Sequence, residues 1–458
     1  MTLSGGEVIS KVCVLLAFVY LARALGPDAF GLVELSLSIT VFFTLAVQHG
    51  LGSYGARTVA ADASRVSLVT ARILVLRACL SAPAYAVILI VSSRYGQPGI
   101  GVLAIYGLVV LLVPFFVEWV FQGLGRMQLV AGGTVLRNLV FSGLVFALVR
   151  PGSDPRWVAI SEVLGAAAFV VFNQVTLRRI VHPAFDWSDL ARGTRRLYAD
   201  AWALGASELT WAGLWYFPTL VVGVLADSEE VAWLAGPIRV VMGLHTFVWL
   251  YFFNLLPGLS RAYKTGPPAW QELTNRSLAT TMWPAMLVAV VGTAMAPEIV
   301  LVLFGSAYEA AAWPLRIVVW MVPIAWFSGH FRFGLIATGH QRSEFAAAVA
   351  AALVSVGGAW AWVPRAGATG AALALVAGGA VNALAVMALT YRRVAPLQVV
   401  QAVSRPIVIG VCCLGASAVI APAVGTIAAT GVTAGVFVLV ALRSDPELVR
   451  LRQVWLGR

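Results

Sequence analysis

Residues 8–57 decide the fold, and they read VISKVCVLLAFVYLARALGPDAFGLVELSLSITVFFTLAVQHGLGSYGAR. The two apolar runs in this stretch, 8–24 and 32–52, are each close to the roughly 20 residues that a helix needs to cross the hydrocarbon core of a bilayer. In the turn between them, Gly26 tolerates unusual backbone angles and Asp28 can cap the next helix. The stretch therefore predicts two membrane-spanning helices joined by a tight turn.

The composition extends this interpretation to the whole chain of 458 residues. Hydrophobic residues make up 60% and charged residues only 11%, and the mean hydropathy is +0.89. A soluble domain of this size needs a more highly charged surface. The net charge of +11 comes almost wholly from arginine. Because the arginines lie between apolar runs, they argue against nucleic-acid binding and for membrane topology.

Apolar runs of similar length recur to the end of the chain. They predict an all-α, polytopic membrane protein with about fourteen transmembrane helices. The expected spans are 8–24, 32–52, 75–93, 100–121, 129–149, 157–176, 203–225, 232–256, 283–303, 315–337, 344–363, 369–389, 405–422 and 424–441.

The spacing of these runs suggests two halves of six helices, the layout of transporters built from structural repeats. We expect an N-terminal lobe at 1–176, a cytoplasmic amphipathic linker at 177–202 and a C-terminal lobe at 203–390. Residues 391–458 would add two further helices and a basic tail.

The distribution of basic residues predicts the orientation. If the N-terminus is cytoplasmic, 20 of the 31 lysines and arginines fall in inside connections or the C-terminal tail and four fall outside. This bias follows the positive-inside rule and places both termini in the cytoplasm.

Several stretches resemble the polysaccharide (oligosaccharide) flippase family, the Wzx-type branch of the multidrug/oligosaccharidyl-lipid/polysaccharide exporter superfamily. The opening motif, Leu-Ala-Arg-Ala-Leu-Gly-Pro-Asp-Ala-Phe-Gly-Leu, is moderately specific, and weaker matches follow in order along the chain. The residues that carry the resemblance are 21–32, 50–52, Arg57, 236–239, 303–311 and 334–339.

The resemblance implies two six-helix lobes around a central cavity, plus two C-terminal helices. It also implies a cargo, an undecaprenyl-pyrophosphate-linked glycan moved to the outer leaflet of a bacterial cytoplasmic membrane. A polysaccharide polymerase and assembly proteins would then be candidate partners, together with the lipid bilayer itself.

Four cations inside the expected spans are candidates for binding the pyrophosphate: Lys11, Arg239, Arg332 and Arg137. A charge at the centre of a span costs about 2.5–3.5 kcal/mol on insertion scales, so it needs a partner or a wet cavity. The paired donors of guanidinium suit phosphate. Snorkelling to the membrane surface is the alternative for Lys11 and Arg332, and a structural ion pair is the alternative for Arg137.

Two acids and two prolines complete the candidate set. Glu118 and Glu208 could bind a coupling cation, carry a proton or pair with a buried arginine. Pro218 and Pro237 interrupt the seventh and eighth spans and are candidate gate hinges, with a static kink as the alternative.

Other charged residues near span ends are expected at the membrane surface or in solvent rather than in the protein interior. These are Arg23, Arg77, Arg316, Glu34, Glu162 and Glu298.

The remaining patterns argue against other function classes. Neither lysine follows the glycine of a phosphate-binding Gly-Lys-Ser/Thr motif, and the histidines and cysteines lack metal-ligand spacing, so we expect no cofactor, no metal site and no catalytic residues. The alternatives within the superfamily are a lipid II flippase and a cation-coupled drug antiporter. A membrane polymerase or glycosyltransferase is the alternative from another class, although the expected outside loops are short.

Overall fold

The computed structural model describes residues 2–181 and 187–444, and these form sixteen α-helices and no β-strand. Twelve helical stretches are long and apolar enough to cross a membrane. Two of them, Ile9–Ala61 and Gln341–Arg393, contain 53 residues each, and each holds two of the spans expected from the sequence. The all-α polytopic class is confirmed, and the count of fourteen spans stays a prediction.

Two glycines bend these long stretches. Helix α1 (Thr2–Gln48) turns at Gly26, whose φ of 77° and ψ of 171° suit glycine alone. Helix α14 (Gln341–Arg393) turns at Gly367, where φ is 49° and ψ is −131°. The turn expected near Gly26 is therefore a sharp kink rather than a loop. Asp28, the expected cap, accepts a hydrogen bond from the Ser228 hydroxyl.

The chain divides into two compact units, Met1–Ala232 and Trp233–Arg458. Unit 1 holds α1, α2 (Leu51–Ala61), α3 (Val66–Ser92), α4 (Gly99–Leu112), α5 (Glu118–Gly123), α6 (Met127–Leu148), α7 (Arg156–Arg178) and α8 (Trp187–Leu225), with the short 3₁₀ helices η1 (Ala63–Arg65) and η2 (Val113–Phe115). The division at 176, 202 and 390 expected from the sequence stays a prediction.

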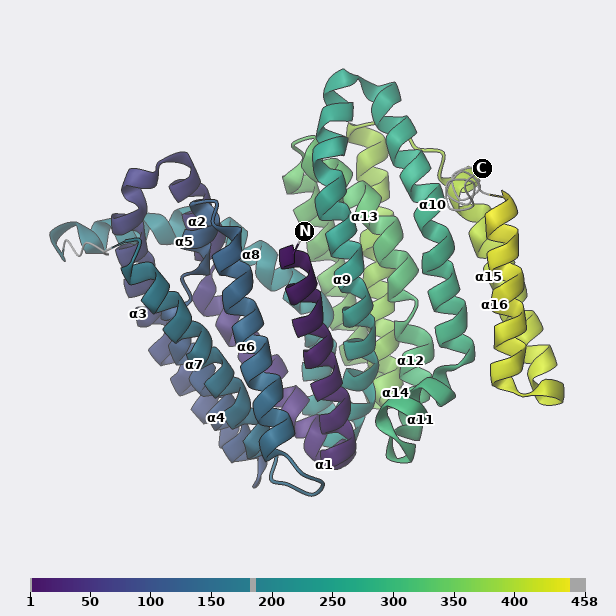
Figure 1. Cartoon of the computed structure of the whole chain (residues 1–458), viewed down its shortest axis with the longest axis horizontal. Helices are drawn as coiled ribbons and strands as arrows, with labels where there is room; N and C mark the ends of the chain where they lie inside the picture. Colours follow the sequence, from purple (N-terminus) through teal and green to yellow (C-terminus); the bar gives the residue numbers. More distant parts are fainter. Residues whose placement is uncertain (1, 182–186, 445–458) are drawn as a thin grey trace. The chain divides into compact units, whose positions relative to one another are not determined.

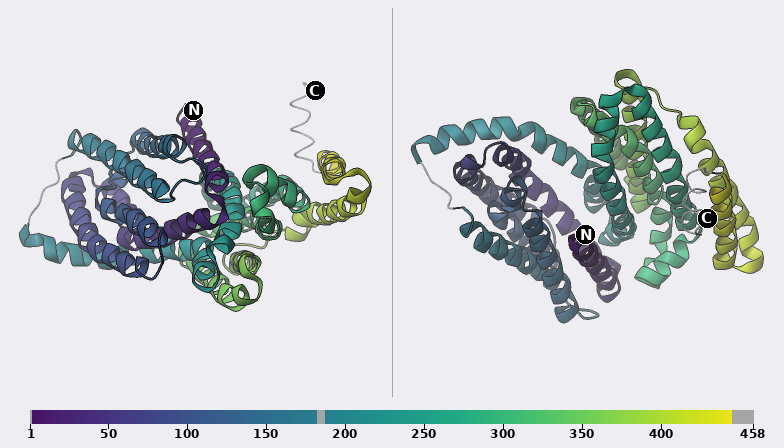
Figure 2. Two further views of the ribbon diagram at one scale, coloured as in Figure 1. Left: turned by 90° about the horizontal axis from the view of Figure 1, so that it is seen from below. Right: turned by 45° about the horizontal axis from the view of Figure 1, so that its top comes forward.

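Within unit 1, α1 is the central helix. It packs against α4, α6 and α8, while α4 and α6 both pack against α7, as Figure 1 allows the reader to follow. Helix α8 is one continuous ribbon in Figure 2 and also contacts α2 and α3. The amphipathic linker was expected at 177–202. Residues 182–186 lie outside the described part, and from Trp187 onward the linker and the seventh span form a single helix.

Unit 2 begins within α9 (Ser228–Thr265) and continues through α10 (Pro267–Ala294), α11 (Ala296–Phe304), η3 (Ser306–Ala311), α12 (Ala312–Val318), α13 (Met321–Ala337), α14, α15 (Val399–Val424) and α16 (Thr426–Ser444). Helix α13 packs against α10 and α14. Helices α15 and α16 form a hairpin against α10 (Figure 1), which agrees with two additional C-terminal helices.

Candidate functional site

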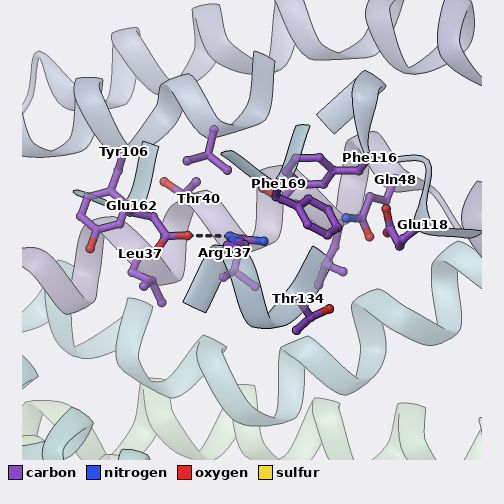
Figure 3. A pocket seen from close by; sticks show the side chains of 14 residues that line it. Leu37, Thr40, Gln48, Tyr106, Phe116, Glu118, Thr134, Arg137, Glu162 and Phe169 are labelled. Atoms are coloured by element: carbon purple, nitrogen blue, oxygen red, sulfur yellow. Dashed lines mark hydrogen bonds and ion pairs between the residues drawn. The ribbon is translucent and has the colours of Figure 1, made fainter. Parts of the chain in front are cut away.

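A cavity of about 400 Å³ lies inside unit 1, among α1, α4, α5, α6 and α7. The lining residues contributed by α1 recur every three or four positions. This spacing places side chains on one face of a helix. Figure 3 shows the side chains of Arg137 and Glu162 directed toward one another among the residues of this wall. The lining residues are Leu37, Thr40, Val41, Thr44, Leu45, Gln48, Tyr106, Val109, Phe116, Glu118, Thr134, Arg137, Glu162 and Phe169.

An ion pair between α6 and α7 forms part of the cavity wall. Arg137 Nη2 of α6 donates to Glu162 Oε1 of α7 at 2.5 Å. The two side chains keep 32% and 16% of their surface exposed, so the pair is only partly withdrawn from solvent. The Arg137 guanidinium carbon also lies 5.7 Å from the centre of the Phe116 ring. Arg137 thus has both an acidic partner and an aromatic neighbour.

Glu162 was expected in solvent at the outer end of its span, and that expectation is wrong. Its carboxylate is part of the cavity wall because the inner face of α7 carries it toward α6. The sequence contained a usable signal, since an intramembrane arginine on one helix favours an acid on the helix that follows it.

Glu118 contributes a second carboxylate to the cavity. It is the first residue of the short helix α5. The extended residue Phe116 lies between the end of η2 and this helix. Glu118 Oε2 is enclosed and has no hydrogen-bond partner among the described residues. Figure 3 shows this side chain beside Gln48 of α1. The result is an enclosed acceptor that faces a polar cavity.

Arg77 of α3 lies behind Glu118, and the interfacial position expected from the sequence is wrong. Its side chain is among the largest fully buried ones, and its Nη1 donates to the Phe116 carbonyl oxygen at 2.8 Å. It interacts electrostatically with Glu118 and with Glu208. The sequence places Arg77 near a span end, but α2 and η2 pack against α3 and enclose the side chain.

Glu208 of α8 lies outside the cavity lining. Its carboxylate accepts a hydrogen bond of 3.0 Å from the Ser53 hydroxyl of α2. The structure therefore brings Glu118 and Glu208 to the same buried arginine but does not place both in one cavity.

In unit 2, Arg332 of α13 has a comparable acidic partner. Its Nε donates to Glu344 Oε1 of α14 at 2.7 Å, and the two side chains are 25% and 7% exposed. Its guanidinium carbon lies 5.7 Å from the centre of the Phe333 ring. Arg137 and Arg332, in separate units, thus share one arrangement: an arginine, an aromatic ring and an acid on the following helix.

The other sequence candidates are not among the residues that line the described cavity. Lys11 is half-buried in the first half of α1, and Arg239 is half-buried in α9 of unit 2. Helices α8 and α9 continue through Pro218 and Pro237, both of which are buried. Roles in substrate binding and hinge motion stay predictions for these residues. Among the described residues, no group of three or more His, Cys, Asp and Glu side chains is arranged to hold a metal ion.

Comparison with protein families gives one match, to a family described as "Polysaccharide biosynthesis protein", over residues 1–263. No curated protein matches the chain. Several solved structures share the fold. The inward closed conformation of the lipid II flippase MurJ has a TM-score of 0.76 at 11% identity and covers 96% of this chain and 99% of its own.

Two further structures belong to the MOP superfamily. An inward-facing multidrug resistance transporter of the MATE family has a TM-score of 0.68 at 15% identity and covers 84% of this chain and 94% of its own. A MOP superfamily transporter from Pyrococcus furiosus has a TM-score of 0.56 at 15% identity and covers 85% of this chain and 95% of its own. These likenesses show that the chain shares the fold of these transporters.

Proposed function

This chain belongs to the polysaccharide biosynthesis protein family, and from that membership we propose that it is a flippase for undecaprenyl-pyrophosphate-linked oligosaccharide. It would move these units across the bacterial cytoplasmic membrane by alternating access, for the synthesis of surface polysaccharide. The observation that carries the proposal is the family match over more than half of the chain, on a fold shared with a lipid II flippase.

The proposed cargo has an anionic part and a polar, uncharged part, and the chain offers residues suited to each. Lys11, Arg239 and Arg332 are the proposed contacts for the pyrophosphate, because ammonium and guanidinium groups bind phosphate oxygens by charge-assisted hydrogen bonds. Arg332 would exchange the Glu344 carboxylate for a phosphate oxygen as the cargo enters. Arg137 is the fourth predicted cation, and it is paired with Glu162 in the wall of the unit 1 cavity.

The energy source in this proposal is an ion gradient or the membrane potential. Glu118 and Glu208 are the proposed coupling acids, since each interacts with the same buried arginine and an acid in such a place can exchange a cation or a proton. Pro218 and Pro237 are proposed hinges, because a proline frees a carbonyl within a helix and permits it to bend. Both termini would face the cytoplasm, and a polymerase and assembly proteins would act on the exported units.

The test is a translocation assay in proteoliposomes that contain the purified full chain. A polyprenyl-pyrophosphate-linked oligosaccharide is placed in one leaflet, and a membrane-impermeant lectin measures its arrival in the other, with and without a sodium or proton gradient. Arg239→Ala is expected to lower the rate about tenfold or more, the loss that follows when a charged hydrogen bond is removed. The matched control is Arg261→Ala, an exposed arginine on the same helix.

The outcomes separate the alternatives. If lipid II or a cationic dye moves instead of the oligosaccharide, the chain serves another branch of the superfamily. If the glycan grows in length without changing leaflets, the chain is a polymerase. If Arg239→Ala and Arg261→Ala transport equally well at equal expression, Arg239 does not contact the cargo.

A further inference from the structure

The unit 1 cavity offers several hydrogen-bond acceptors beside the Arg137 guanidinium. The hydroxyl of Thr40 donates to the Ser36 carbonyl at 2.8 Å, and that of Thr134 donates to the Val130 carbonyl at 3.1 Å. With their protons committed to their own helices, both hydroxyl oxygens can only accept from a ligand. Glu118 Oε2 adds an enclosed acceptor without a partner among the described residues. Such a wall suits a ligand with several donors, and it disfavours the pyrophosphate diester of the proposed cargo, which at neutral pH has acceptors only.

The charges around the cavity also exclude a pyrophosphate as its occupant. Arg137 is matched by Glu162 at 2.5 Å. Arg77, the other arginine near the cavity, interacts with two carboxylates, those of Glu118 and Glu208. The acids therefore equal or exceed the cations, and no surplus positive charge remains for an anion. An uncharged polar ligand meets no electrostatic penalty here.

The apolar part of the wall supplies aromatic surface. The Phe116 and Phe169 rings meet edge to face, with centroids 5.2 Å apart and planes at 79°, and Tyr106 lines the cavity beyond them. The volume of about 400 Å³ falls within the roughly 300–1,000 Å³ of small-molecule pockets and greatly exceeds the space of one ion. A ring with apolar C–H faces and a rim of hydroxyl donors matches these dimensions and this chemistry.

We propose that the unit 1 cavity binds an uncharged sugar ring of the transported glycan. Phe116, Phe169 and Tyr106 contact the C–H faces of the ring, while Glu118, Thr40 and Thr134 accept hydrogen bonds from its hydroxyls. The inference rests on the proposed function, since it assigns the sugar and the pyrophosphate of one cargo to different places. It also gives Arg137 a positioning role: its ion pair holds Glu162 and the α6–α7 wall in place.

Binding is tested on the purified full chain in nanodiscs, by saturation-transfer NMR with soluble probes. The probes are the methyl glycosides of glucose, galactose, mannose, rhamnose and N-acetylglucosamine, with methyl glucuronide and inorganic pyrophosphate as competitors. We expect at least one neutral glycoside to bind, and methyl glucuronide and pyrophosphate to leave its signal unchanged. Glu118→Gln and Thr134→Val each remove one acceptor with little change in volume and should weaken binding about tenfold. Gln122→Leu, an exposed change on α5, is the matched control and should bind as the wild type does.

Each outcome of the binding experiment either supports or overturns the proposed sugar site. The inference is overturned if no neutral glycoside binds, if pyrophosphate displaces the bound glycoside, or if Glu118→Gln and Gln122→Leu behave alike. A thermal unfolding midpoint close to that of the wild type shows that a variant has kept its fold. Failure of the flippase proposal is a separate result, because it appears as absent oligosaccharide translocation by the wild-type chain, whatever the glycosides do. A chain that translocates the oligosaccharide but binds no glycoside keeps the proposed function and loses the sugar site.

Discussion

Replacing Arg137 by methionine tests whether its ion pair with Glu162 holds the wall of the unit 1 cavity. An exposed pair contributes about 0.2–1 kcal/mol, while removing one partner of a buried pair costs about 3–5 kcal/mol. The side chains are 32% and 16% exposed, so we expect a loss of about 2 kcal/mol, between these limits. For a unit the size of Met1–Ala232, this lowers the unfolding midpoint by about 4–8 °C.

The assay is thermal unfolding of the purified chain in detergent, followed by intrinsic fluorescence. A double-mutant cycle with Glu162→Met isolates the interaction, because the double variant leaves no unmatched charge and should regain about 1 kcal/mol or more. The control is Arg65→Met, which breaks an exposed pair with Asp62 whose side chains are 66% and 46% exposed. Equal losses for Arg137→Met and Arg65→Met, or strictly additive effects in the cycle, would refute the reasoning.

Three further predictions concern unit 2, the α1 kink and the turn before α3. Arg332→Met should destabilise the chain by about 2–3 kcal/mol and Glu344→Gln by less, because Glu344 is 7% exposed and Arg332 is 25% exposed; thermal unfolding measures both. Gly26→Ala should cost about 1–3 kcal/mol, since an alanine is strained at φ 77° and ψ 171°, and the same assay applies. Hydrogen bonds from the side chain and backbone N–H of Ser64 lower the pKa of Asp62; the carboxylate therefore stabilises the turn at neutral pH, and this stabilisation is lost as the pH falls below about 4. Asp62→Ala should thus increase hydrogen–deuterium exchange of residues 62–66 at pH 7, and the difference from the wild type should vanish under acid.

These three predictions have distinct refutations. A larger loss for Glu344→Gln than for Arg332→Met would mean that burial does not set the cost of the unmatched charge. For the kink, Gly143→Ala is the control, because Gly143 has open space and ordinary helical angles; equal effects at both glycines would remove the argument from backbone strain. A pH-independent difference in exchange, after correction for intrinsic rates, would show that the charge of Asp62 does not stabilise the turn.

The fold was predictable because its determinants are local. Apolar runs of about 20 residues match the thickness of a bilayer and therefore predict membrane spans. The Gly-Pro pair at residues 26 and 27 predicts the first kink at the correct position. Helix ends were less predictable, since an amphipathic linker and a following span can merge without any local signal. Helix α8 shows this, as it runs unbroken from Trp187 to Leu225.

The candidate site was predictable only in part, because burial of a charge depends on which helices cover it. Arg137 and Glu118 were singled out from their depth in a span, and both line the cavity. Arg77 was assigned to the membrane surface from its distance to a span end. The sequence could not show that the Phe116 carbonyl would meet its guanidinium and enclose it.

A more general rule follows from the two paired arginines. Arg137 and Arg332 both lie deep in a span, and each is paired with an acid on the next helix, 25 and 12 residues later. Both acids are visible in the sequence, but a position near a span end does not by itself show that Glu162 pairs with Arg137. An intramembrane arginine should therefore be evaluated together with the acids of the helix that follows it. In the proposed assignment, the charge of Arg137 positions the cavity wall, and other cations of the chain bind the cargo's anionic group.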